Sequence, residues 1–189
     1  MCSRTKMYNK EAKIIIAGFG GQGVVLTGNI LARAGMAEDK YVTGMVSYGA
    51  EMRGGTANST VVISDHEIAS PFVTNPNIAI ILNQPSLDKF EERLLPDGLV
   101  VINTSMISRE VKRSDLEVVK IAATDIANKL GNVKVANIVS LGAFIKKSGL
   151  LKAEIVTQAI EELFSSKKPK LVEINKKAFQ QGADNCVIA

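Results

Sequence analysis

The chain has 189 residues, enough for one domain with a sizeable core, and 46% of them are hydrophobic, as in a globular protein. Its net charge of +4 comes from scattered basic residues, which favour solvated helical faces over a contribution to binding anionic ligands or partners. No segment resembles a nucleic-acid-binding motif. No apolar run reaches the roughly 18 residues of a membrane span, and the polar N-terminus lacks the apolar stretch of a signal peptide, so we expect a cytoplasmic protein.

Metal sites and histidine-dependent catalysis are not expected. Cys2 and Cys186 are the only cysteines, and His66 is the only histidine. An iron–sulfur cluster usually takes about four cysteine ligands, and a structural zinc site needs a similar set of Cys and His. We therefore expect that the chain alone holds neither, that His66 lies in a turn, and that no residue here is catalytic.

The predicted elements alternate along the chain. Short β-branched or apolar runs predict strands at 13–17, 41–46, 56–64, 78–82, 99–102 and 117–121, with a short return strand at 67–69. Apolar periodicity predicts helices at 22–35, 86–95, 124–131, 137–147, 152–164 and 170–181. Ser86 and Thr124 are expected to cap two of these helices, and Gly35, Gly131 and Gly182 to end three of them.

This order predicts an α/β fold with a Rossmann-like, open, mixed but mostly parallel sheet flanked by helices. The segment 56–69 would add antiparallel strands, and the C-terminal part would be helical. We expect a single domain over residues 1–189. Residues 1–12 would be flexible, 13–182 would fold, and 183–189 would form a tail.

A glycine loop follows the first predicted strand and precedes the first helix. Gly18, Gly20 and Gly23 match the pattern G-x-G-x-x-G, and Gly21 and Gln22 lie between them. Such a loop lets a ligand approach the backbone at a helix N-terminus, where free N–H groups favour an anion. The carboxylate that would bind an NAD ribose is missing from the end of the second strand. An NAD site, a turn that only packs the helix, and a site for another anion or a partner all remain open.

A second loop follows the next predicted strand. Arg53 offers a planar fork for phosphate or carboxylate, and Gly54 and Gly55 would let a ligand approach the backbone. Because both loops follow strands of one βαβ unit, we expect them at the same edge of the sheet. The alternative is an exposed ion pair between Arg53 and Glu51, which would contribute little.

Three apolar side chains in loop-rich segments are candidates for a surface that a partner would cover. They are Met45, Met52 and Phe72. On the predicted helix 137–147, Asn137 and Ser140 are polar residues among apolar ones. Each is either a satisfied hydrogen-bonding group in the core or a contributor to the edge with the two loops.

The two loops together resemble the gamma subunit of the 2-oxoacid:ferredoxin (acceptor) oxidoreductases. The resemblance rests on the sequence from Gly18 to Gly23, on Ser-Tyr-Gly-Ala-Glu-Met-Arg-Gly-Gly at 47–55, and on Ile-Ser-Asp at 63–65. Asn137 with the following Leu-Gly at 141–142 also fits. The second loop looks most like the 2-oxoglutarate and branched-chain 2-oxoacid members. Ser59 replaces a cysteine that related sequences often carry, which weakens any role for a thiol there.

The resemblance implies a subunit that is inactive alone. The complex would oxidatively decarboxylate a 2-oxoacid, with 2-oxoglutarate the expected one, form an acyl-CoA and reduce ferredoxin or another acceptor. Thiamine diphosphate, Mg²⁺ and iron–sulfur clusters would belong to the alpha, beta and, where present, delta subunits. This chain would bind no cofactor by itself and could self-associate in isolation.

The resemblance also assigns help in admitting or orienting CoA to the loop positions Gly20, Gly21, Gln22 and Arg53. The neighbouring glycines of the two loops, Gly18, Gly23, Gly54 and Gly55, would face CoA or a partner subunit with them. A stand-alone NAD(P)-dependent Rossmann dehydrogenase and a purely structural assembly subunit are the two alternatives.

Overall fold

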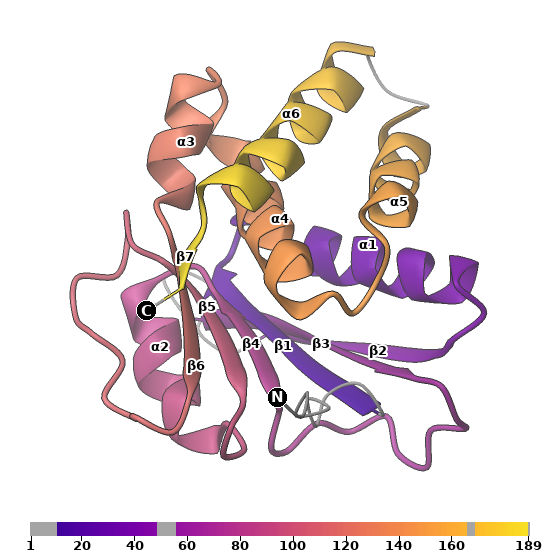
Figure 1. The fold of residues 1–189 in the computed structure, drawn as a ribbon, viewed down its shortest axis with the longest axis vertical. Helices are drawn as coiled ribbons and strands as arrows, with labels where there is room; N and C mark the ends of the chain where they lie inside the picture. Colours follow the sequence, from indigo (N-terminus) through magenta and orange to yellow (C-terminus); the bar gives the residue numbers. More distant parts are fainter. Residues whose placement is uncertain (1–10, 49–55, 166–168, 189) are drawn as a thin grey trace, which may run out of the picture.

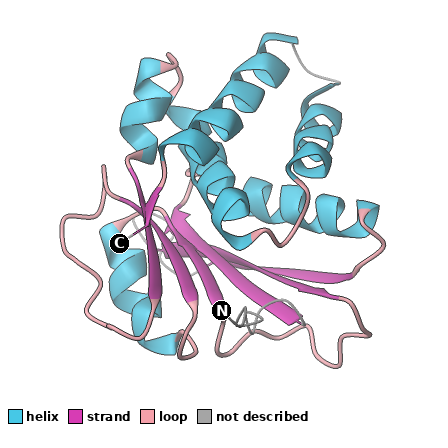
Figure 2. Ribbon diagram, viewed as in Figure 1, coloured by secondary structure: helices cyan, strands magenta, loops and turns pink. Residues whose placement is uncertain are grey.

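The computed structural model describes residues 11–48, 56–165 and 169–188, and over these ranges it forms a mixed sheet with helices on both faces (Figures 1 and 2). The strands are β1 (Glu11–Phe19), β2 (Tyr41–Tyr48), β3 (Thr56–Ser64), β4 (Ile78–Ile81), β5 (Leu99–Asn103), β6 (Glu117–Ile121) and β7 (Val187–Ile188). The α-helices are α1 (Val24–Ala37), α2 (Gln84–Phe90), α3 (Ala123–Lys129), α4 (Ala136–Ser148), α5 (Ala153–Ser165) and α6 (Pro169–Asn185). Two short 3₁₀ helices are η2 (Glu91–Arg93) and η3 (Val133–Val135).

The sheet has the order β2-β3-β1-β4-β5-β6-β7. Strands β1, β4, β5 and β6 are parallel, β3 runs antiparallel to both β1 and β2, and β7 runs antiparallel to β6. The predicted α/β class, with a mostly parallel mixed sheet and a helical C-terminal part, is confirmed.

Two cores lie on opposite faces of the sheet. On one face, α1, α3, α4, α5 and α6 pack over alternate residues of the strands, such as Ile14 and Ile16 of β1. On the other face, α2 and the segment after β5 cover Ile15, Ile81 and Ile102. Figure 1 shows this asymmetry, with α2 on the side of the sheet away from the other helices. Alternation along β1 therefore sends apolar side chains into both cores, which explains its continuous apolar run.

The antiparallel part of the sheet differs from the prediction in two ways. Strand β3 lies between β1 and β2, so β1 and β2 are not neighbours as a simple βαβ unit would have them. The predicted return strand at 67–69 does not form. Both sides of β3 are already paired, with β1 and with β2, so a further strand has no free partner there. His66 lies just after β3, where its N–H donates to Ser64 Oγ, and its predicted turn position is confirmed.

Two glycines that were expected to end helices lie inside them. Helix α1 continues past Gly35, where an added Cβ would lie 2.9 Å from Val42 Cγ2. Helix α6 continues past Gly182, where an added Cβ would lie 1.9 Å from the carbonyl oxygen of Val139 in α4. These glycines are needed because other elements approach closely, and not because the helix stops. Gly131, with a φ of 82°, follows the end of α3 as predicted.

The expected domain limits also change at both ends. Glu11 and Ala12 belong to β1 and were wrongly assigned to a flexible start, whereas residues 1–10 lie outside the described part. The predicted tail after residue 182 is the last turn of α6 followed by β7, which pairs with Val119 and Lys120 of β6. Within the described ranges, no helix is long and apolar enough to cross a membrane.

Candidate functional site

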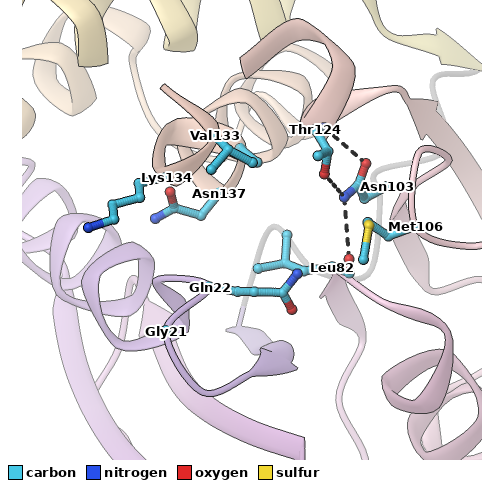
Figure 3. A pocket seen from close by; sticks show the side chains of 10 residues that line it. Gly21, Gln22, Leu82, Asn103, Met106, Thr124, Val133, Lys134 and Asn137 are labelled. Atoms are coloured by element: carbon cyan, nitrogen blue, oxygen red, sulfur yellow. Dashed lines mark hydrogen bonds between the residues drawn. The ribbon is translucent and has the colours of Figure 1, made fainter. Parts of the chain in front are cut away.

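The carboxyl ends of the four parallel strands meet at one edge of the sheet, which is where open α/β folds bind ligands. A cavity of about 180 Å³ lies there, between the glycine loop after β1 and the start of α4 (Figure 3). Its walls are mainly apolar and include Leu82, Met106, Val133 and Ala136. Its polar groups come from Gln22, Asn103, Thr124, Lys134 and Asn137.

The glycine loop carries two left-handed residues. Gly21 has a φ of 90° and Gly23 a φ of 77°, which side chains rarely tolerate. Gly23 is also the N-cap of α1 and has no side chain to satisfy the free N–H groups of the first turn. Gly21 lines the cavity, so the predicted position of this loop at a ligand-binding edge agrees with the fold.

Gly23 is held by a residue far away in the sequence. Asn137 Nδ2 of α4 donates to the carbonyl oxygen of Gly23 at 3.2 Å and to Thr27 Oγ1 at 3.1 Å. A Cβ on Gly23 would lie 2.5 Å from this nitrogen, so the contact requires glycine. Asn137 lines the cavity, as one expectation had it, but it is only half satisfied, because its buried Oδ1 has no hydrogen-bond partner among the described residues. Neither expectation holds for Ser140, which is fully buried on α4, does not line the cavity and has an Oγ without a hydrogen-bond partner in the described part of the chain.

Gln22 is held by two donors at its side-chain oxygen. The N–H of Phe19 donates to Gln22 Oε1 at 2.6 Å, and Asn83 Nδ2 donates to the same oxygen at 2.9 Å. Gly18 leaves room for this amide, since a Cβ there would lie 2.7 Å from Gln22 Oε1. Gly18 is thus needed for the placement of Gln22. In contrast, a Cβ on Gly20 would meet no atom within 4 Å.

Two asparagines that were not predicted as site residues lie at the ends of the neighbouring strands β4 and β5. Asn83 is the N-cap of α2, and its Oδ1 accepts from the N–H of Ser86, so Ser86 is not the cap that was predicted. Asn103, at the end of β5, accepts from the N–H groups of Ala123 and Thr124 and so satisfies the start of α3 in place of the predicted Thr124 cap. A polar residue directly after an apolar strand run was the signal that could have identified both.

The second predicted loop is only partly placed. Tyr48 at the end of β2 pairs with Ala57, and Ala57 pairs with Gly18, so both flanks of this loop lie at the edge that carries the glycine loop. Residues 49–55, which include Glu51, Arg53, Gly54 and Gly55, lie outside the described part of the chain. The predicted role of Arg53 and its two glycines therefore stays a prediction.

The cavity offers hydrogen bonds and apolar contact, without an acid–base pair. Its lining contains no carboxylate, histidine or cysteine among the described residues, and Lys134 is an exposed cation at its border. Among the described residues, the carboxyls whose pKa is lowered lie elsewhere: Lys40 hydrogen-bonds to Asp65, Arg109 to Asp88 and Arg113 to Asp115. No group of three or more His, Cys, Asp or Glu that could hold a metal ion occurs in the ranges that the structure describes. This arrangement suits binding of a ligand better than proton transfer.

Among the described residues, the strand next to the glycine loop lacks the carboxylate of a standard dinucleotide site. Such a site takes a carboxylate from the end of the strand that neighbours β1 in parallel. Here the parallel neighbour is β4, which is followed by Leu82 and Asn83, and the other neighbour is the antiparallel β3. Within the described ranges, the position that carries the acidic residue in NAD-binding folds is therefore taken by Leu82 and Asn83.

Comparison with known sequences identifies the family. The profile of the family described as pyruvate ferredoxin/flavodoxin oxidoreductase matches residues 13–185. Ketoisovalerate oxidoreductase subunit VorA of Methanothermobacter marburgensis is 36% identical over 176 residues, which are 93% of this chain and 36% of VorA. The chain thus spans about a third of VorA. 2-Oxoglutarate synthase subunit KorC of Methanocaldococcus jannaschii is 37% identical over 160 residues, which are 83% of this chain and 84% of KorC.

Solved structures agree with this result. The gamma subunit of the keto/oxoacid ferredoxin oxidoreductase from Geobacter sulfurreducens is 30% identical, with a TM-score of 0.78 over 92% of this chain and 96% of that one. The 2-oxoglutarate:ferredoxin oxidoreductase from Magnetococcus marinus shares the fold at a TM-score of 0.85 over 95% of this chain and 32% of that one, with 20% identity. The chain therefore belongs to the pyruvate ferredoxin/flavodoxin oxidoreductase family and corresponds to its gamma subunits.

Proposed function

We propose that this chain is the gamma subunit of a thiamine-diphosphate-dependent 2-oxoacid oxidoreductase that forms acyl-CoA and reduces ferredoxin or another acceptor. The observation that carries the proposal is the likeness to gamma subunits. The family profile matches residues 13–185, and the Geobacter sulfurreducens gamma subunit is 30% identical with a TM-score of 0.78. In such a complex, alpha, beta and, where present, delta chains would supply the thiamine diphosphate, Mg²⁺ and iron–sulfur clusters.

2-Oxoglutarate is the 2-oxoacid that we propose. Relatives named for 2-oxoglutarate and for ketoisovalerate have similar identities to this chain, 37% and 36%, so identity alone does not separate them. The common gamma subunits of pyruvate/ketoisovalerate oxidoreductases are less similar, for example 33% identical in Thermococcus kodakarensis. The support for 2-oxoglutarate is the 37% identity to the KorC subunit of Methanocaldococcus jannaschii, together with the resemblance of the loop at 47–55 to the 2-oxoglutarate members.

We further propose that the edge with the cavity receives part of CoA. The glycine loop offers a helix N-terminus with no acidic residue in its first turn, and Lys134 adds a positive charge at the border. The apolar walls suit the uncharged part of such a ligand. A related structure is described with coenzyme A and succinyl-CoA bound, which makes CoA the ligand to test first.

Steady-state kinetics of the reconstituted complex test this proposal. If Arg53 meets a CoA phosphate, Arg53→Ala removes a charge-assisted hydrogen bond worth about 1.5–3 kcal/mol, and the KM for CoA should rise roughly ten- to a hundred-fold. The KM for the 2-oxoacid should hardly change, and the complex should still assemble. Gln22→Ala should act in the same direction more weakly, because it removes an uncharged partner.

Arg93→Ala is the matched control. This arginine donates to the carbonyl oxygen of Thr74 and lies beside Phe90, away from the cavity, so its loss should leave the KM for CoA unchanged. An unchanged KM for CoA in Arg53→Ala, together with loss of a subunit on gel filtration, would make Arg53 an assembly residue. An unchanged KM in an intact and fully active complex would contradict a role for Arg53 in CoA binding.

A further inference from the structure

Asn83 connects a helix cap to the cavity. It directly follows the Leu82 that lines the cavity wall, and its side chain is only 1% exposed. Its Oδ1 accepts from the N–H of Ser86 at 3.0 Å, which fixes the orientation of the Asn83 amide. The opposite orientation would place an NH₂ group against the N–H of Ser86. The nitrogen of Asn83 must therefore point the other way, toward Gln22.

The same reasoning fixes the orientation of the Gln22 amide. Its Oε1 accepts from Asn83 Nδ2 at 2.9 Å and from the N–H of Phe19 at 2.6 Å. If Gln22 turned its nitrogen to these positions, it would face two donors and lose both hydrogen bonds. Gln22 Nε2 is thus left on the opposite side, and it has no hydrogen-bond partner among the residues that the structure describes. In Figure 3 this nitrogen points toward Leu82, while the oxygen points away from it.

We propose that Asn83 is a positioning residue that holds the Gln22 amide with its N–H group toward the cavity. The edge then favours a ligand oxygen that accepts a hydrogen bond at Gln22, such as a carbonyl or phosphoryl oxygen. Part of this ligand assignment rests on the proposed function, because CoA carries both kinds of oxygen. The orientation of Gln22 depends only on Ser86, Asn83 and Phe19.

Asn83→Asp tests the orientation with the smallest change in shape. Aspartate keeps an oxygen for the N–H of Ser86 and is itself a good N-cap, but it replaces the donor to Gln22 by an acceptor. Gln22 should then turn its nitrogen to the new carboxylate and its oxygen to the cavity, because the charge-assisted hydrogen bond that it gains outweighs the hydrogen bond from the N–H of Phe19 that it gives up. NMR of the isotopically labelled full chain reads this directly. The Gln22 side-chain amide protons should show NOEs to methyl groups of Leu82 and Met106 in the wild type and should lose them in Asn83→Asp.

Asn132→Asp is the control. Asn132 caps η3 through an Oδ1 that accepts from the N–H of Lys134, and it makes no hydrogen bond to Gln22. The NOEs of Gln22 should therefore remain in this variant. If Asn83→Asp does not fold, Gly18→Ala disturbs the same amide while leaving the cap of α2 intact, because the new Cβ would lie 2.7 Å from Gln22 Oε1. Unchanged NOEs in the folded variant, or their absence in the wild type, would overturn the proposal.

Kinetics of the complex then separate the positioning role from the CoA assignment. Asn83→Asp should raise the KM for CoA about tenfold, which is the effect of one lost hydrogen bond, with kcat and the KM for the 2-oxoacid unchanged. Two fragments of CoA would show which oxygen meets Gln22: pantetheine carries carbonyl oxygens, and adenosine 3′,5′-bisphosphate carries phosphoryl oxygens. The fragment that binds the full chain more weakly in Asn83→Asp than in the wild type carries the oxygen that Gln22 contacts. An altered NOE pattern with an unchanged KM for CoA would support the positioning role and contradict CoA binding at this cavity.

Discussion

Replacing Gly182 by alanine tests a close contact between the backbones of α4 and α6. A Cβ at Gly182 would lie 1.9 Å from the carbonyl oxygen of Val139, and a Cβ at Gly142 would lie 2.0 Å from that of Phe179. The backbones of α4 and α6 therefore touch through two glycines, one on each helix. Ordinary van der Waals contact begins at 3.4 Å, so Gly182→Ala would force the helices apart by roughly 1.5 Å.

The expected cost follows from this displacement. Overpacking of a core usually costs about 1–3 kcal/mol, and a gap of about 1 Å removes up to about half of the attraction across an interface. The higher helix propensity of alanine returns about 1 kcal/mol. Because backbone atoms cannot move aside as a side-chain end can, we expect a net loss of about 2–3 kcal/mol in the free energy of unfolding. For a chain of this size that corresponds to a fall in Tm of roughly 5–10 °C.

Urea unfolding followed by circular dichroism would measure this loss. Gly20→Ala is the control, because its Cβ would meet no atom within 4 Å, and it should change the free energy by less than about 0.5 kcal/mol. The double variant Gly142→Ala with Gly182→Ala should cost less than the sum of the single variants, since one separation of the helices relieves both overlaps. A Gly182→Ala chain as stable as the wild type would refute the close contact.

Three further predictions concern ligands, surface and pH. The isolated chain should bind neither NADH nor an iron–sulfur cluster, and micromolar NADH binding by calorimetry or visible absorbance after cluster reconstitution would contradict this. Phe72 is 68% exposed and lines a hollow of about 260 Å³ with Met45 on the sheet face opposite α1, so Phe72→Ser should reduce self-association of the isolated chain in sedimentation velocity. A wild-type chain that is strictly monomeric would argue against that surface. The hydrogen bond from Arg109 lowers the pKa of Asp88 below its ordinary 3.8, so the stability from this pair is present above pH 3.8 and is lost as the pH falls through the lowered pKa. Asp88→Asn should therefore be slightly less stable than the wild type at neutral pH and equally stable at low pH, and a difference that grows on acidification would contradict the assignment.

The strands of the sheet were predictable because their residues are locally consistent. Apolar or β-branched runs mark β4, β5 and β6 to within one residue, and β3 at both ends. The position of β3 between β1 and β2 could not be read in the same way. Strand order depends on which pairings bury the most apolar surface, and the local sequence of β3 does not indicate which strands it pairs with.

The candidate site was predictable where backbone conformation limits the residue type. Gly21 and Gly23 have positive φ values, so they leave a visible glycine pattern in the sequence. Asn83 and Asn103 were missed because asparagine is common in loops, and its role here comes from partners that are distant in the sequence. The helix ends at Gly35 and Gly182 were wrong for a related reason, since a glycine required by a neighbouring element looks like one that stops a helix.

The hydrogen bond between Gly23 and Asn137 links residues that are 114 positions apart. A second link of the same separation joins Glu38 Oε1 at the end of α1 to the N–H of Lys152. During synthesis, β1, β2 and β3 can pair long before α4 leaves the ribosome, whereas the cavity has no wall on that side until α4 docks. The ligand-binding edge should thus be among the last parts of the chain to become complete, and ligand binding should report that the C-terminal helices have reached their final positions.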